Sequence, residues 1–139
     1  DIYMLCRQIK ADLPVSTLYL VTGDSTGAAR SALTQGNINY YSVIANILDL
    51  APAQMRQHRV NWSHADSYVL VNSVLQNGNV AIDPSCKGLI FDMNHVKIVY
   101  KEEKLEILKD RKDETRNADF MDTWRYFCQT FRTDFVRLS

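Results

Sequence analysis

Short apolar runs alternate with segments of helical character along this chain, and that alternation limits the possible folds more than any other feature. Runs at 17–22, 57–61 and 80–82 have the length and composition of strands. Helices are expected at 2–11, 40–50, 65–76, 85–94 and 117–131. Two further runs, 96–100 and 105–108, predict a hairpin closed by residues 101–104. Strands that alternate with helices indicate an α/β protein with a largely buried sheet.

Length and composition are those of one globular domain. The chain has 139 residues, of which 46% are hydrophobic and 23% charged, so a single domain covering 1–139 can bury a core. No run approaches the roughly 18 apolar residues that a membrane span needs, and no membrane partner is expected. The three cysteines lack a paired C-x-x-C spacing, which argues against a structural zinc site.

The net charge bears on nucleic-acid binding. It is zero, so no global positive field favours a DNA reader. An enzyme that contacts phosphates through a local patch and bound metal stays compatible with this balance. Four cationic side chains could contact phosphates, although a solvated surface charge is the default interpretation of each: Lys87, Lys109, Arg111 and Lys112.

The strongest local signal is the turn Gly23-Asp24-Ser25-Thr26-Gly27 after the first predicted strand. A carboxylate at the carboxyl end of a buried strand lies where open α/β sheets place their ligands. The alternative is that Asp24 only forms an Asx-turn, for which Asp-Ser sequences are suited. Both interpretations stay open on the sequence.

A second signal is the pair Asp119 and Asp122 on the last predicted helix. Residues three apart share a helix face, and two like charges so placed repel unless a cation or basic group lies between them. A divalent metal with oxygen ligands would satisfy both. The alternative for Asp119 is a first-turn acid favoured by the helix dipole, which is weaker for Asp122 because it lies deeper in the helix.

The remaining acids have simpler interpretations. Asp66 stands three residues after Ser63, the spacing of a capping box, so capping is favoured over catalysis. Asp83 precedes a proline and is expected to end a strand, and Asp92 is expected on a helix surface.

Taken together, these segments resemble the carboxyl-terminal nuclease domain of the large terminase subunits of tailed bacteriophages. The family's Gly-Asp-[Ala/Ser]-Ser-Gly is matched at 23–27, with Thr26 replacing the usual serine. Its Ile-Asp-Pro-x-Cys-Lys-x-Leu-Ile-x-Asp is matched almost residue for residue at 82–92. Looser matches in the same order lie at 39–44, 59–66 and 119–126.

The resemblance implies an RNase H-like fold, with a central mixed sheet flanked by helices. It also implies a metal-dependent endonuclease that cuts concatemeric double-stranded DNA during genome packaging. In the family three acids hold two Mg²⁺ or Mn²⁺ ions, and Asp24 and Asp122 match the second and third of these acids. Asp119 stands where the family has a histidine, and it could replace that histidine as a ligand.

The resemblance further implies partners and a location. These are double-stranded DNA, the phage portal and the small terminase subunit, at the procapsid in the host bacterial cytoplasm. Only 23 residues precede Asp24, so the first acid, the first strands and the ATPase motor are expected to be missing from this piece. The alternatives are another RNase H-like nuclease of resolvase or integrase type, and a non-catalytic interaction domain of the packaging machinery.

Overall fold

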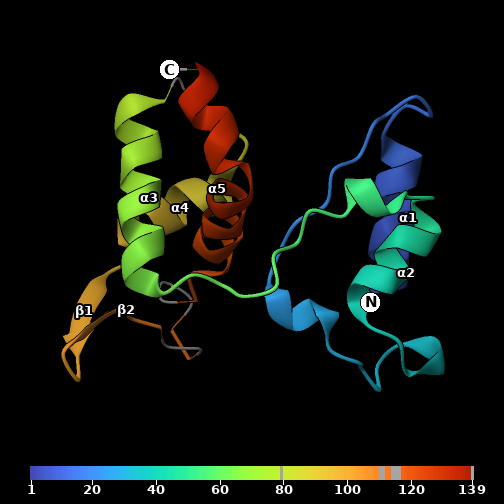
Figure 1. Cartoon of the computed structure of the whole chain (residues 1–139), viewed down its shortest axis with the longest axis horizontal. Coiled ribbons are helices and arrows are strands. Elements are labelled where there is room, and N and C mark those ends of the chain that lie inside the picture. The colour runs from blue at the N-terminus through green and yellow to red at the C-terminus, as the bar shows by residue number, and fades with distance from the viewer. Residues whose placement is uncertain (79, 110–111, 114–116, 139) are drawn as a thin grey trace. The chain divides into compact units, whose positions relative to one another are not determined.

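The computed structural model describes residues 1–78, 80–109, 112–113 and 117–138. The chain divides into two compact units, residues 1–60 and 61–139, which are described separately below (Figure 1). The expectation of one domain over 1–139 stays a prediction. In the described residues, no helix is both long and apolar enough to cross a membrane.

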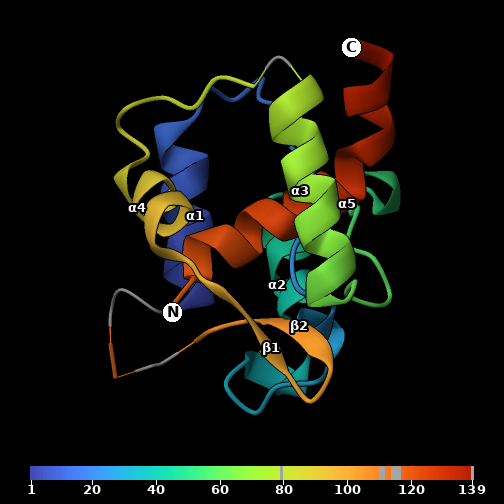
Figure 2. The same cartoon turned by 90° about the vertical axis from the view of Figure 1, so that its left-hand side faces the viewer.

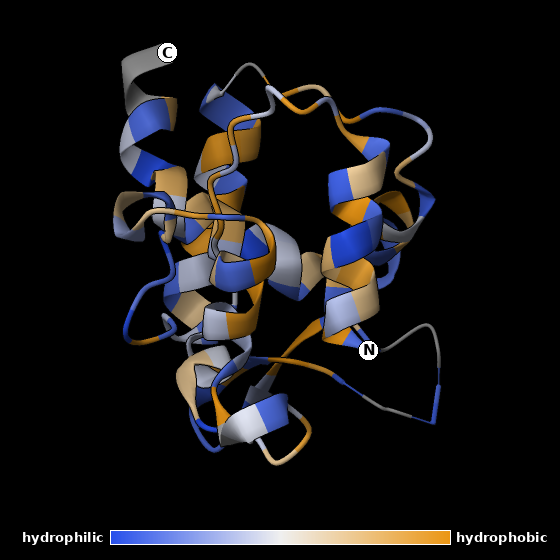
Figure 3. Ribbon diagram, turned by 90° about the vertical axis from the view of Figure 1, so that its right-hand side faces the viewer, coloured by the Kyte–Doolittle hydropathy of each residue, from blue (hydrophilic) through white to orange (hydrophobic). Residues whose placement is uncertain are grey.

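The first unit is built on two helices, α1 (Ile2–Asp12) and α2 (Tyr40–Ile47), which pack against each other. Their buried contacts include Cys6 and Val43, each 2% exposed. Lys10 of α1 donates to the carbonyl of Ile47 at 3.0 Å and pairs with Asp49 at 2.6 Å, so it holds the end of α2. Figure 3 shows apolar and polar stretches alternating along the helices, as helices with one buried face require. Short 3₁₀ turns complete the unit at Ser25–Ala28, Gln35–Asn37 and Pro52–Gln54.

The second unit is mainly helical, with α3 (His64–Asn77), α4 (Lys87–His95) and α5 (Asp119–Leu138). Helices α3 and α5 lie side by side in Figures 1 and 2, and α4 packs on α5. The core is formed where Val71 and Val74 of α3 meet Cys128 of α5, which is fully buried. Helix α5 bends at Phe131, where φ is −103° and ψ is 17°. It continues past this bend to Leu138, beyond the predicted end at 131.

A β-hairpin completes the second unit (Figure 2). Strands β1 (Ile98–Lys101) and β2 (Lys104–Ile107) pair antiparallel, with Ile98 opposite Ile107. The two turn residues, Glu102 and Glu103, both have positive φ, 48° and 64°, as a type I′ turn requires. The predicted hairpin is therefore confirmed, although its turn lacks the usual asparagine or glycine.

The other predicted strands are wrong. Residues 17–22 contribute only an isolated bridge from Val21 to Met55, and residues 57–61 and 80–82 form no strand. The sheet that the structure describes has two strands, so the α/β class holds but a central mixed sheet is not seen in those residues. Short apolar runs are ambiguous because a buried loop needs the same side chains as a buried strand. The RNase H-like arrangement stays a prediction.

Two aromatic side chains of α5 are exposed rather than buried in the core. Phe120 is 57% exposed and Phe127 is 38% exposed. The side chains that α5 buries deeply are instead Arg125, Cys128 and Gln129. The helix therefore turns a partly polar face inward, and this orientation places Arg125 and Asp122 near α3.

Candidate functional site

Asp24 lies at the start of the 3₁₀ turn Ser25–Ala28 in the first unit. Its Oδ1 accepts the backbone N–H of Thr26 at 2.8 Å, and its carbonyl accepts the N–H of Gly27 at 3.1 Å. This is the Asx-turn that the sequence allowed as one of two interpretations. Asp24 is partly buried.

Tyr41 explains the two glycines that flank this turn. Its hydroxyl donates to the Asp24 carbonyl at 2.7 Å, and its ring packs across the loop. A Cβ at Gly23 would lie 2.8 Å from the Tyr41 hydroxyl oxygen, and one at Gly27 would lie 2.9 Å from the ring. Burial, and then the charge of Asp24, raise the pKa of Tyr41 to about 12. The space beside the turn is thus occupied by Tyr41, a residue that the sequence analysis did not single out.

Asp122 of α5 is held by two cations. Arg125 Nη1 donates to its Oδ1 at 2.5 Å, and Lys109 Nζ donates to its Oδ2. The Asp122 side chain is 16% exposed, and that of Arg125 is 5% exposed. Arg125 also reaches Ser67 Oγ of α3 at 3.3 Å, which ties the pair to the neighbouring helix. The basic group that the sequence offered as an alternative to a metal is therefore present.

Both acids of α5 lie in its first turn. Asp119 is exposed at the first helical position, in agreement with a first-turn acid favoured by the helix dipole. Asp122 lies three residues further into the helix, as expected, and its N–H donates to the carbonyl of Ala118 at 2.9 Å, but it still belongs to the first turn. Both acids therefore lie at the positive end of the helix dipole, and their sharing of one cation stays a prediction.

Asp92 supplies the cap of α5, and its assignment to a helix surface is wrong. It is 5% exposed, and its Oδ2 accepts the N–H groups of Phe120 and Met121 at 2.9 and 3.0 Å. The residue before α5, Ala118, is fully buried with φ 57° and has no side-chain oxygen to cap the helix. A carboxylate from α4 fills that role. Sequence periodicity could not reveal a cap supplied from another helix.

His64 lies beside the Asp122 pair, at the start of α3. Its Nδ1 accepts the N–H of Ile107 at 3.1 Å, so a neutral ring carries its proton on Nε2. Burial, and then the charges of Arg125 and Lys109, lower the pKa of His64. The sequence gave no sign of this role, because the three histidines are scattered along the chain.

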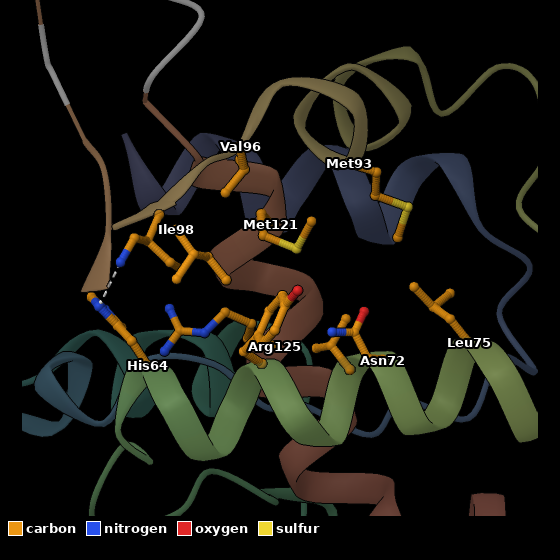
Figure 4. A pocket seen from close by; sticks show the side chains of 11 residues that line it. His64, Asn72, Leu75, Met93, Val96, Ile98, Met121 and Arg125 are labelled. Atoms are coloured by element: carbon orange, nitrogen blue, oxygen red, sulfur yellow. Dashed lines mark hydrogen bonds between the residues drawn. The ribbon is translucent and has the colours of Figure 1, made fainter. Parts of the chain in front are cut away.

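A pocket of about 400 Å³ opens next to these residues (Figure 4). His64 and Arg125 line one end, and Met93, Met121 and Val96 line another. Arg125 Nε lies buried with no hydrogen-bond partner among the described residues. The pocket is therefore lined by a cationic side chain as well as by apolar ones.

The four cationic side chains that were predicted to contact phosphates differ in their surroundings. Lys87, at the start of α4, and Lys112 are exposed, and Lys109 is paired with Asp122. Arg111 lies outside the described residues. Whether any of the four contacts DNA stays a prediction.

The other acids behave largely as the sequence indicated. Ser63 Oγ accepts the N–H of Asp66 at 3.1 Å, which confirms Ser63 as the N-cap of α3, and its hydroxyl donates to the Asp66 carboxylate at 2.6 Å. Asp83 is exposed and its Oδ1 accepts the N–H of Ser85 at 2.8 Å, so it begins a turn although no strand precedes it.

The metal-binding role of Asp24, Asp119 and Asp122 stays a prediction. Asp24 belongs to the first unit and Asp122 to the second, so the proposed meeting of their carboxylates is likewise a prediction. Across residues 1–78, 80–109, 112–113 and 117–138, no three His, Cys, Asp or Glu side chains are grouped to hold a metal ion.

Comparison with known proteins relates the chain to a viral protein. It is 26% identical over 132 residues to "Terminase, large subunit" of Escherichia phage T5. The match covers 85% of this chain and 30% of that relative, so the chain spans less than a third of the phage protein's length. No protein-family model and no solved structure matches the chain.

Proposed function

We propose that this chain is part of the nuclease region of a phage large terminase subunit, a divalent-metal-dependent endonuclease that cuts concatemeric double-stranded DNA during genome packaging. The observation that carries the proposal is the similarity to the T5 large subunit over 85% of the chain. The order of the motifs around Asp24, Asp92 and Asp122 supports the same assignment. The partners would be DNA, the portal and the small terminase subunit, in the cytoplasm of the host bacterium.

The chemistry of the candidate ligands fits Mg²⁺ or Mn²⁺, because both ions bind carboxylate oxygens. Asp24 and Asp122, with Asp119 beside the latter, would hold the ions. When bound, two such ions supply an activated water and neutralise the charge on the leaving 3′ oxygen. The chain's own part is to fix the carboxylates: the turn at Thr26 orients Asp24, and Arg125 holds Oδ1 of Asp122.

Plasmid nicking with acid-to-amide variants tests the proposal. Asp24→Asn and Asp122→Asn are each expected to abolish Mn²⁺-dependent nicking, while Asp83→Asn, at an exposed turn, should retain it. The assay should use the full protein from which this chain derives, so that any upstream acid is present. Full cutting by both variants would refute the metal site. A comparison of linear duplex with a four-way junction then separates a terminase from a resolvase.

A second candidate, a non-catalytic interaction domain of the packaging machinery, is favoured by one observation. Asp122 is already neutralised by Lys109 and Arg125, so it has a structural use without metal. This alternative predicts that Mn²⁺ does not bind to the chain and that Asp122→Asn changes stability alone. Titration with Mn²⁺ distinguishes it from the nuclease.

A further inference from the structure

One face of α3 forms a side of the pocket of about 400 Å³ in the second unit (Figure 4). Four pocket residues repeat along that helix at spacings of four, four and three, and therefore share a face: His64, Tyr68, Asn72 and Leu75. Helices α4 and α5 and the hairpin supply the other sides. The volume falls in the range of small-molecule sites, about 300–1,000 Å³.

The two ends of the pocket differ in polarity. His64 and Arg125 lie at one end, and Met93 and Leu75 lie toward the other (Figure 4). Met121 of α5 adds a second thioether side chain, a flexible group that adapts to the shape of an apolar partner. A ligand that fills the pocket therefore needs one polar group and an apolar body.

Arg125 supplies charge rather than a free donor at the polar end. Its side chain is 5% exposed, its Nη1 and Nη2 already have partners, and its Nε is buried. Burial, and then the charges of Arg125 and Lys109, lower the pKa of His64. The opposing charges of Asp122 and Glu106 act less strongly on the ring. The electrostatic potential at this end is therefore positive and favours an anionic group.

His64 supplies the donor. Its Nδ1 accepts the N–H of Ile107 at 3.1 Å, which leaves the Nε2–H of the neutral ring for another acceptor. Among the residues that the structure describes, none accepts from this Nε2. A carboxylate both accepts such a hydrogen bond and carries the charge that the positive potential favours.

We propose that this pocket binds a small organic carboxylate, whose charged group meets His64 and whose apolar body lies against Met93 and Met121. A mostly apolar lining with a few polar groups at one end is typical of small-molecule sites. The inference goes beyond the proposed nuclease and does not depend on it, because none of the proposed metal ligands lines the pocket.

Methyl NMR of the full protein from which this chain derives, labelled at methionine, tests the proposal. Hexanoate should shift the methyl signals of Met93 and Met121 in a saturable way, with a dissociation constant of about 1 mM. The variants Met93→Leu and Met121→Leu assign the two signals. Met4 and Met55 belong to the first unit, and their signals should stay unchanged.

A ligand series separates the two parts of the claim. Hexanamide keeps the apolar body but lacks the charge, and should bind about fivefold more weakly than hexanoate. Butyrate keeps the charge but has a shorter chain, and should bind about tenfold more weakly. Equal affinity for hexanamide and hexanoate would refute the anionic ligand, and equal affinity for butyrate would refute the role of the apolar end.

Two variants of α3 locate the site. Leu75, 41% exposed, lines the pocket, and Leu75→Trp should fill part of it and weaken hexanoate binding about tenfold. The matched control is Val69→Trp, at a 67% exposed position of the same helix outside the pocket, which should bind as wild type does. His64→Phe should weaken binding about fivefold, whereas His64→Gln, which retains an N–H donor, should lose less.

The result that overturns the proposal is the absence of saturable shifts at Met93 and Met121 up to about 10 mM hexanoate. Equal affinity in wild type and Leu75→Trp would place the ligand elsewhere and would refute the site as well. Because both variants of this pair lie at exposed or partly exposed positions, the test does not depend on whether His64→Phe folds. Plasmid nicking reports on the nuclease alone, so the two proposals can fail separately.

Discussion

The two candidate acids are held by different kinds of partner. Asp24 is held by neutral groups, because its Oδ1 accepts the backbone N–H of Thr26 and its carbonyl accepts the hydroxyl of Tyr41. Asp122 is fixed by charges, because Lys109 and Arg125 each donate to one of its oxygens. An amide side chain could replace the first carboxylate in its turn, whereas an amide at the second position would leave Lys109 and Arg125 without their counter-ion.

This difference matters for any experiment that changes the acids. Substitution of Asp24 by asparagine keeps the Asx-turn and removes the negative charge, so it isolates a chemical role. The same change at Asp122 also leaves Arg125, whose side chain is 5% exposed, without its counter-ion. A loss of activity at position 122 must therefore be compared with a measurement of stability.

The largest effect is expected at Tyr41, which supports the region of Asp24. Tyr41→Ala should destabilise the first unit by about 4 kcal/mol, because it removes a buried ring from between Gly23 and Gly27. Tyr41→Phe, which removes the hydroxyl alone, should cost about 1 kcal/mol. Hydrogen exchange of residues 20–45 should measure both, since the two tryptophans of the chain, Trp62 and Trp124, belong to the second unit. Equal exchange in both variants would show that the ring does not support the turn.

The same tyrosine gives a pH test. Its pKa is raised to about 12 in the folded protein, so the unfolded chain loses the proton first as pH rises above about 10. The stabilisation is complete below pH 10 and is lost as pH rises toward 12. Between pH 9 and 11.5, the protection of residues 20–45 against hydrogen exchange should fall more in the wild type than in Tyr41→Phe.

Removal of the carboxylate that caps α5 should be next in size. Asp92→Ala leaves two helix N–H groups without their acceptor and should cost about 2 kcal/mol. Asp92→Asn retains one acceptor oxygen and should cost less. Urea unfolding followed by tryptophan fluorescence reports the second unit and measures both variants. Equal stability of the alanine variant and wild type would contradict the capping role.

The direct test of the comparison is the matched pair of acid-to-amide variants. Asp122→Asn should destabilise its unit by about 2 kcal/mol, since it removes charge-assisted hydrogen bonds to Lys109 and Arg125. Asp24→Asn should change the stability of the first unit by less than about 0.5 kcal/mol. Urea unfolding and hydrogen exchange, each applied to the unit concerned, give the two values. A similar loss of stability in both variants would show that the two acids are not held by different kinds of partner.

The smallest effect is expected from His64. Its pKa is lowered in the folded protein, so the unfolded chain takes up the proton first as pH falls below 6.5. The stabilisation is present above pH 6.5 and is lost as pH falls through the lower folded pKa. His64→Gln should flatten the loss of stability between pH 7 and 5, which urea unfolding can follow. His95, exposed at the end of α4, provides the matched control.

The sequence predicted elements well where local patterns are sufficient. The helices near 2–11, 40–50 and 65–76 and the hairpin are confirmed within a few residues, because periodicity, caps and turns are properties of neighbouring residues. The runs at 17–22 and 80–82 failed as strands, because a strand needs a pairing partner that no local pattern specifies.

The contacts of the candidate site residues could be predicted only where the partners are close in sequence. The Asx-turn of Asp24 and the N-cap of α3 by Ser63 involve residues two or three apart, and both were foreseen. Asp92 acts on residues 28 and 29 positions away, and Lys109 reaches Asp122 across 13. Contacts of that range depend on how α4, α5 and the hairpin pack, which the sequence pattern does not specify.

Ala118 has a consequence for how the acids of α5 could evolve or be engineered. Its φ is positive and the residue is fully buried, so position 118 needs both a left-handed backbone and a small side chain. Glycine would relieve the backbone strain but would leave a gap where the methyl group was. A β-branched residue would disfavour the backbone conformation and would also be too large for the space. That torsion sets the direction in which α5 leaves the preceding loop. A single bulky replacement at 118 should therefore re-aim Asp119 and Asp122 as one rigid pair and draw the helix start away from Asp92, without altering any acidic residue.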